Sequence, residues 1–285
     1  MTDHTSTLII GANGQLAKAM QRQYPSARAV GHNELDLCDA TAIAHFDWSG
    51  VTTIINTAAY TNVDGAETAE GRTTAWRINA QAVGQLAHIC SERDITLVHV
   101  SSDYVFDGET APHTEDEPFS PLSVYGASKA AGDIAASTTP RHYIIRTSWV
   151  IGDGKNFVTT MFGLAAKNIA PTVVADQIGR LSFTPEIARA IDYLVENKAP
   201  YGTYNVTNSG PLVSWADITR QIFALAGRDD LPVTDTTTAE YFANKPGVAP
   251  RPLNSDLSLE KLHATGFASQ DWQDALHEYV VRSIH

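Results

Sequence analysis

The stretch Leu8-Ile-Ile-Gly-Ala-Asn-Gly-Gln-Leu-Ala17 carries an apolar run into a helix-like segment through two glycines. Gly11 permits a tight turn, Gly14 lets the backbone approach a diphosphate, and Ala17 stands where a small residue allows close packing of helix on strand. Backbone N–H groups at the start of a helix favour bound phosphate. The stretch therefore predicts a dinucleotide-binding turn between the first strand and the first helix of an α/β sheet.

Strand-like and helix-like segments alternate along the first half of the chain. Such alternation is typical of βαβ units on a parallel sheet. We expect strands at 8–10, 27–30, 53–57, 95–100 and 143–147, and helices at 15–23, 73–93 and 124–136. The pattern predicts a Rossmann-type, doubly wound parallel sheet over residues 1–150 that binds NAD(P).

After Trp149 the alternation becomes less regular, and prolines from Pro171 to Pro252 separate shorter elements. We expect helices there at 157–167, 185–197, 215–226 and 272–283. The sequence predicts a smaller C-terminal substrate-binding lobe over residues 151–285, with some of its elements returning to the main sheet.

The chain has 285 residues, of which 43% are hydrophobic, and a formal net charge of −12. It can form one large domain or a domain with a smaller companion. The acidic balance argues against nucleic acid or an anionic membrane as a partner, because both reward an excess of Lys and Arg. A small-molecule ligand is expected, and an anionic one needs a local basic pocket.

Residues 1–7 are polar and lack the pattern of a signal peptide, and no run approaches the roughly 18 apolar residues that span a bilayer. We therefore expect a cytoplasmic protein. Cys38 and Cys90 are too few for a disulfide framework. The ten histidines form no His-Glu-x-x-His or comparable cluster, so the sequence predicts no bound metal.

Tyr125 and Lys129 lie four residues apart in Ser123-Val-Tyr-Gly-Ala-Ser-Lys129, within a predicted helix. Residues at this spacing share a helix face, so the ammonium can lie beside the phenol. We expect the cation to lower the pKa of Tyr125 from about 10 towards neutrality, where a general acid works best. Taken alone, the spacing also fits an amphipathic helix with a solvated lysine. Together with the glycine turn, it predicts a redox enzyme in which Tyr125 protonates an oxygen while a cofactor delivers hydride.

Ser101-Ser-Asp103 directly follows the predicted strand 95–100. In open α/β sheets ligands bind beyond the carboxyl ends of the strands. We therefore predict that Ser102 donates a hydrogen bond to a substrate carbonyl, and the alternative is a strand-end cap. Arg251 lies between two prolines, and its planar guanidinium suits a diphosphate, with a solvated arginine on a turn as the alternative.

The second predicted strand runs into Gly31-His-Asn33, with no carboxylate before Glu34. An acidic residue at the strand end would select NAD through the ribose hydroxyl. We therefore expect NADPH as the cofactor, with NADH as the alternative, because Arg28 and His32 would tolerate a 2′-phosphate. Asp36 and Leu37 follow at a position suited to cradling adenine.

Several longer stretches of the sequence resemble a known family. These stretches are Gly14-Gln-Leu16, Asn56-Thr-Ala-Ala-Tyr-Thr-Asn-Val-Asp64, Ser101-Ser-Asp-Tyr-Val-Phe-Asp-Gly108, Pro121-Leu-Ser-Val-Tyr-Gly-Ala-Ser-Lys129, Arg146-Thr-Ser-Trp-Val150 and Arg251-Pro-Leu-Asn-Ser255. Over nearly the whole chain the sequence resembles the extended short-chain dehydrogenase/reductase family. Within it, the likeness is to members that reduce the C4 keto group of dTDP-4-dehydro-L-rhamnose, the last step of dTDP-rhamnose synthesis. The resemblance implies an NAD(P)H-dependent oxidoreductase acting on a nucleotide sugar.

The resemblance also implies roles for individual residues. Cofactor contacts are implied for Gly14, Gln15, Leu16, Asp36, Leu37, Ala59, Tyr60, Thr61, Val100, Tyr125 and Lys129. Substrate contacts are implied for Ser102, Asp103 and Trp149. A buried core aromatic is the other interpretation of Trp149.

Three positions depart from the family pattern. Ala17 replaces the commoner third glycine, a tolerated change. Some members bind magnesium between subunits through a glutamate in the first helix, but this chain has Ala19 there. We therefore expect no metal, and both a monomer and a homodimer stay open. Gly179-Arg-Leu-Ser-Phe-Thr184 differs from the usual Gly-x-Pro-Thr, a change near the expected substrate contacts.

Two other functions fit the same architecture. One is a regulatory homologue without turnover, similar to the β subunit of methionine adenosyltransferase, and intact Ser102, Tyr125 and Lys129 argue against it. The other is an extended-family nucleotide-sugar epimerase or dehydratase, which retains its cofactor and shows no net consumption of it.

Overall fold

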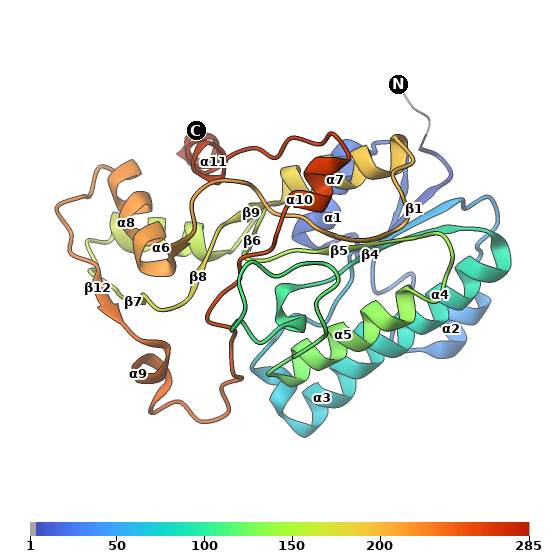
Figure 1. Ribbon diagram of the computed structural model, residues 1–285, viewed down its shortest axis with the longest axis horizontal. Helices are drawn as coiled ribbons and strands as arrows, with labels where there is room; N and C mark the ends of the chain where they lie inside the picture. Colours follow the sequence, from blue (N-terminus) through green and yellow to red (C-terminus); the bar gives the residue numbers. More distant parts are fainter. Residues whose placement is uncertain (1–3, 285) are drawn as a thin grey trace.

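A six-stranded parallel sheet forms the centre of the computed structural model, which describes residues 4–284 (Figure 1). The strand order is β10-β5-β4-β3-β1-β2. The strands are β1 (Thr7–Ile10), β2 (Arg28–Val30), β3 (Thr53–Asn56), β4 (Thr96–Val100), β5 (His142–Arg146) and β10 (Gly202–Asn205). All neighbouring pairs in this sheet are parallel. The predicted Rossmann-type fold is confirmed.

Helices cover both faces of the sheet, as Figure 1 shows. One face carries α1 (Gln15–Gln23), α7 (Thr184–Glu196) and α10 (Glu260–Ala264); the other carries α2 (Ala40–His45), α3 (Ala69–Trp76), α4 (Ala82–Arg93) and α5 (Val124–Ala136). Successive strand residues point to opposite faces. Ile9 and Ile55 accordingly pack with the helices of the first face, and Leu8 and Ile54 with those of the second. Both faces are covered, which is why the middle of β1 and of β3 is apolar on both sides.

Most of the second half forms the lobe drawn on the left of Figure 1. It contains three two-stranded ladders, β6 (Val150–Ile151) with β9 (Ser182–Phe183), β7 (Thr172–Val174) with β12 (Thr234–Thr236), and β8 (Ile178–Gly179) with β11 (Val213–Ser214). Its helices are α6 (Phe157–Ala166), α8 (Trp215–Leu225), α9 (Thr238–Phe242) and α11 (Trp272–Ile284). A separate apolar core around Phe223 and Trp272 holds these elements together.

The long helix predicted at 73–93 is wrong in its start and its continuity. α3 begins at Ala69, a π-helical turn follows at Arg77–Gln81, and α4 completes the run. Such turns insert one extra residue into a helix and occur often at functional sites. The predicted helices 15–23 and 124–136 have the observed bounds. The elements that went unpredicted are α2, α9, α10, β10 and the short strands of the lobe.

The strand order reverses between β1 and β3, because the chain leaves β1 for β2 on one side and returns to β3 on the other. Loops that leave adjacent strands in opposite directions open a crevice at the strands' carboxyl ends. The glycine turn and the residues after β3 and β4 therefore meet at one place. Over residues 4–284, no helix has the length and apolar character that crossing a membrane requires.

Candidate active site

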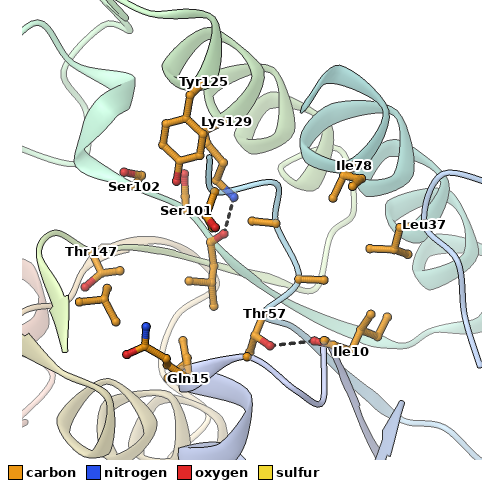
Figure 2. A pocket seen from close by; sticks show the side chains of 18 of the residues that line it. Ile10, Gln15, Leu37, Thr57, Ile78, Ser101, Ser102, Tyr125, Lys129 and Thr147 are labelled. Atoms are coloured by element: carbon orange, nitrogen blue, oxygen red, sulfur yellow. Dashed lines mark hydrogen bonds between the residues drawn. The ribbon is translucent and has the colours of Figure 1, made fainter. Parts of the chain in front are cut away.

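A cavity of about 720 Å³ opens at this reversal of strand order. Figure 2 looks into it and shows side chains that converge from β1, from α5 and from the segments after β3, β4 and β5. Of the residues predicted for the site, the following line the cavity: Gly11, Gly14, Gln15, Leu16, Asp36, Leu37, Ala59, Thr61, Val100, Ser102, Asp103, Tyr125, Lys129 and Trp149. The structure thus gathers residues from widely separated parts of the chain around one space.

The glycine turn forms one end of this cavity. Gly11 has φ +94°, a left-handed conformation that favours glycine. A Cβ atom there would lie 2.9 Å from the backbone nitrogen of Ala58, so the turn packs directly on the segment after β3. Gly14 supplies no side-chain cap to α1, which leaves the first N–H groups of that helix to an anion. The turn fits a diphosphate.

The end of β2 forms the adjoining wall, where Gly31, His32 and Asp36 line the cavity. The Glu34 carboxylate folds back to accept a hydrogen bond from the Gly31 N–H at 2.8 Å. Asp36 accepts one from the Cys38 N–H, also at 2.8 Å. Both carboxylates are thus held by backbone, and the exposed His32 ring lies beside Asp36, with its Nδ1 3.4 Å from Asp36 Oδ1.

Asn79 holds the loop after β3 in place. It lies in the π-helical turn, is almost fully buried, and accepts a hydrogen bond from the Tyr60 N–H at 2.8 Å while donating to the Tyr60 carbonyl at 3.1 Å. It also donates to the Ser128 hydroxyl on α5 at 3.0 Å. One amide therefore fixes the loop of Ala59 and the helix of Tyr125 relative to each other.

Tyr125 and Lys129 point side by side into the cavity from α5 (Figure 2). Ser123 caps the start of the helix, because its hydroxyl accepts a hydrogen bond from the Gly126 N–H at 3.1 Å. The Lys129 ammonium donates to the Val100 carbonyl at 2.7 Å, so it is anchored to the end of β4. Both side chains are buried. The predicted shared helix face is confirmed.

The expected direction of the Tyr125 pKa shift is wrong. Burial, opposed by the nearby Ser102 hydroxyl and aided by the charges of Asp103 and Asp133, raises the pKa of Tyr125 to about 12. Burial lowers the pKa of Lys129 to about 8, with Asp133 acting in the opposite sense. Desolvation acts against both charged forms and outweighs the attraction that helical spacing suggests. Tyr125 is consequently a fully protonated acid at neutral pH.

Ser102 and Asp103 form a buried hydrogen-bonded chain beside Tyr125. The Ser102 hydroxyl donates to Asp103 Oδ1 at 2.9 Å and accepts from the Tyr104 N–H at 3.2 Å. The Ser255 hydroxyl donates to the other oxygen, Asp103 Oδ2, at 2.6 Å. Burial still raises the pKa of Asp103. Ser102 thus caps the short helix Asp103–Val105, as the alternative interpretation expected, and also lines the cavity.

Three predicted residues do not line the cavity. Arg28, expected near a 2′-phosphate, lies over the Phe46 ring, 4.8 Å from its centroid. Tyr60 directs its hydroxyl towards Gly65 and Gly71, while its neighbours on either side line the cavity. Arg251 pairs with Asp64 at 3.0 Å, donates to the Ala249 carbonyl at 2.9 Å and stacks on Phe242. Burial raises the pKa of Tyr104, a lining residue, and the charge of Arg251 acts against that rise. The proposed contact of Arg251 with a diphosphate stays a prediction.

Several lining residues were not singled out from the sequence, among them Asn13, Thr57, Ile78, Tyr104, Thr147 and Ser148. Thr57 follows β3, and Thr147 and Ser148 follow β5, so the strand-end rule that selected Ser102 would have found them. Tyr104 lies edge-on to Tyr125, with ring centroids 5.4 Å apart. Ile78 comes from the π-helical turn, which has no sequence signal of its own.

A parallel sheet with a phosphate-binding turn and a buried Tyr–Lys pair at its switch point defines a Rossmann-type oxidoreductase of the extended short-chain class. Residues 5–284 match the family model described as the RmlD substrate binding domain, and the chain belongs to that family. The predicted resemblance is confirmed.

Three relatives illustrate the match. The sequence is 37% identical to a dTDP-4-dehydrorhamnose reductase of Aggregatibacter actinomycetemcomitans, over 94% of this chain and 96% of that protein. A dTDP-4-dehydrorhamnose reductase structure from Clostridium acetobutylicum has a TM-score of 0.90 at 35% identity, covering 98% and 99% of the two chains. The Bacillus anthracis enzyme, crystallised in complex with NADP, has a TM-score of 0.88 at 32% identity and covers 97% and 98%.

Proposed function

We propose that this protein reduces the C4 keto group of dTDP-4-dehydro-L-rhamnose with NADPH, forming dTDP-L-rhamnose. The observation that carries the proposal is that Tyr125, Lys129 and Ser102 face the same cavity as the Gly11–Gly14 turn. Relatives that match over nearly their full length bear the name of this reductase. NADH is the alternative cofactor, and the Bacillus anthracis structure with NADP supports NADPH.

The residues present fit a dinucleotide. The turn at Gly11 would clash if it carried a side chain, and the start of α1 has no side-chain cap. Gly14, Gln15 and Leu16 would hold the diphosphate, and Asp36 and Leu37 the adenosine end. When bound, NADPH supplies the hydride that reduces C4.

Tyr125 gives its phenolic proton to the C4 oxygen, so that the ketone becomes a secondary alcohol. Its raised pKa keeps the proton in place until then. Lys129 orients the ribose and stabilises the phenolate that is left. Ser102 donates to the same oxygen once its hydrogen bond to Asp103 is exchanged. Asp103 and Trp149 contact the substrate.

The proposal extends to the parts of the chain and to its setting. Residues 1–150, with β10, bind the cofactor, and residues 151–285 mainly bind the nucleotide sugar. Arg251 binds its diphosphate. The protein works as a monomer or homodimer in the cytoplasm, where NADPH and nucleotide sugars are found.

An NADPH oxidation assay across several 4-keto nucleotide sugars tests the proposal. We expect stoichiometric consumption of NADPH with dTDP-4-dehydro-L-rhamnose. A regulatory homologue would bind cofactor without consuming it. An epimerase or dehydratase would transform the sugar without net oxidation, so product analysis by mass spectrometry separates the three outcomes.

A further inference from the structure

The backbone at Trp149 is strained. Trp149 has φ +44°, which bulky residues rarely adopt and which costs on the order of 1–3 kcal/mol. Among residues 4–284, the other non-glycine residues with positive φ are Asp94, Asn168 and Lys198, and each lies one or two residues after the end of a helix. Trp149 instead lies between β5 and β6 and lines the cavity. A strained conformation persists only where the surroundings impose it.

Trp215 is the main restraint on the Trp149 side chain. The two indole rings are stacked, with centroids 3.7 Å apart and an interplanar angle of 18°. Gly179 also lies against the Trp149 ring, where an added Cβ would lie 2.9 Å from Cε2 and Cζ2. The Trp149 carbonyl accepts a hydrogen bond from the Ser182 N–H at 3.1 Å. Both the ring and the backbone are therefore held by the lobe.

Trp215 is itself fixed by contacts within the lobe. Its Nε1 donates to Gln177 Oε1 at 3.2 Å, and Phe157 packs on it with a centroid distance of 4.4 Å. It is the first residue of α8, directly after β11, and β11 pairs with β8, which contains Gly179. The same small ladder thus places both Trp215 and Gly179 against Trp149.

We propose that Trp215 is a positioning residue that sets the substrate-facing wall of the cavity by holding Trp149 in its left-handed conformation. The inference rests on the proposed function, because it concerns how the nucleotide sugar is oriented. Trp215 does not line the cavity, whereas Trp149 does. Its effect on the substrate therefore passes through Trp149.

The test is a double-mutant cycle of Trp215→Leu and Trp149→Ala. We expect Trp215→Leu to raise the substrate KM about tenfold, the upper end of what a stacked aromatic pair contributes. The NADPH Kd should not change. In the Trp149→Ala background, Trp215→Leu should add nothing, because residues that act through each other are not additive. Trp215→Phe, which keeps a ring to stack on, should restore most of the lost affinity.

Circular dichroism supplies a measurement independent of turnover. Two stacked indoles couple their transitions, and the coupled signal should be lost in Trp215→Leu and in Trp149→Ala but kept in Trp48→Phe, a buried tryptophan that does not line the cavity. Titration with dTDP-L-rhamnose should perturb this signal in the wild-type protein.

An equal KM increase with and without Trp149 would overturn the inference, as would an unchanged KM in Trp215→Leu. If Trp215→Leu fails to fold, an unperturbed signal on titration of the wild type overturns it. Wild-type protein that does not consume NADPH with the keto sugar refutes the proposed function instead, and the spectroscopic comparison can still be made.

Discussion

Two walls of different construction enclose the cavity. The wall at Gly11, Gly14 and Ala59 consists of backbone and small residues held by the strands of the main sheet. The wall at Asp103 and Trp149 consists of larger side chains, each held by a contact from the second half of the chain. A wall of backbone loses little conformational entropy when it binds a ligand that is always the same, such as a cofactor. A wall of side chains can instead be replaced residue by residue to fit a different substrate. Tyr125 lies where the two walls meet.

Tyr125→Phe should have the largest effect, because it removes the proton donor at the junction of the two walls. We expect kcat to fall about 10²- to 10⁴-fold with NADPH binding retained. Stopped-flow single turnover and NADPH titration measure the two quantities. A variant with half the wild-type kcat would refute the assignment of Tyr125 as the acid.

Gly11→Ala should damage the backbone wall alone. The new Cβ would meet the Ala58 backbone in a left-handed turn, so we expect NADPH affinity to fall at least tenfold and the free energy of unfolding to fall by about 1–2 kcal/mol. Calorimetric titration and urea unfolding check this. Gly154→Ala, also at positive φ but with open space around it, is the matched control for backbone strain without a clash.

The pH dependence of kcat/KM reports on the protonation of Tyr125 and Lys129 in the free enzyme. Lys129 has a pKa of about 8, and Tyr125 one of about 12. As pH rises through 8 the ammonium loses its proton while the phenol keeps its own. We therefore expect kcat/KM of the wild type to fall about tenfold per pH unit above pH 8. In Lys129→Arg this descending limb of the pH profile should disappear. A limb that persists in Lys129→Arg would assign it to another group.

Arg251→Ala tests the rim of the side-chain wall. If Arg251 binds the diphosphate, the substrate KM should rise several-fold to tenfold with the NADPH Kd unchanged, and Arg251→Lys should recover only part because an ammonium lacks the planar fork. Asp64→Asn removes the ion-pair partner without removing the cation. If the substrate KM stays constant in Arg251→Ala, Arg251 serves only the ion pair with Asp64.

Glu34→Gln should have the smallest effect. The carboxylate accepts from the Gly31 N–H at the cavity edge, so removing its charge should favour NADPH over NADH by about threefold, less than 1 kcal/mol. Paired Kd measurements with both cofactors decide this. If the ratio of the NADH Kd to the NADPH Kd is equal in the variant and the wild type, the charge of Glu34 does not affect binding of the 2′-phosphate.

The backbone wall could be predicted from the sequence because its requirements are local. Gly11 and Gly14 serve a turn only a few residues long, and the spacing of Tyr125 and Lys129 determines their shared helix face. The side-chain wall depends on pairs such as Asp103 with Ser255, which lie 152 residues apart. No local pattern marks such a pair. The predicted direction of the Tyr125 pKa shift was wrong for a similar reason, since burial is a property of the assembled fold.

The strand β10 also affects how the protein is made. It pairs with β5 along Tyr143–Arg146, yet it lies at Gly202–Asn205, after the first elements of the lobe. Synthesis at about 5–20 residues per second takes several seconds to pass from β5 to β10. Throughout that interval, one edge of a nascent parallel sheet has unpaired N–H and C=O groups, a template for aggregation. The main sheet therefore cannot be completed during synthesis before part of the lobe has emerged from the ribosome. In a chain that stops at residue 150, the edge of β5 would stay unpaired permanently.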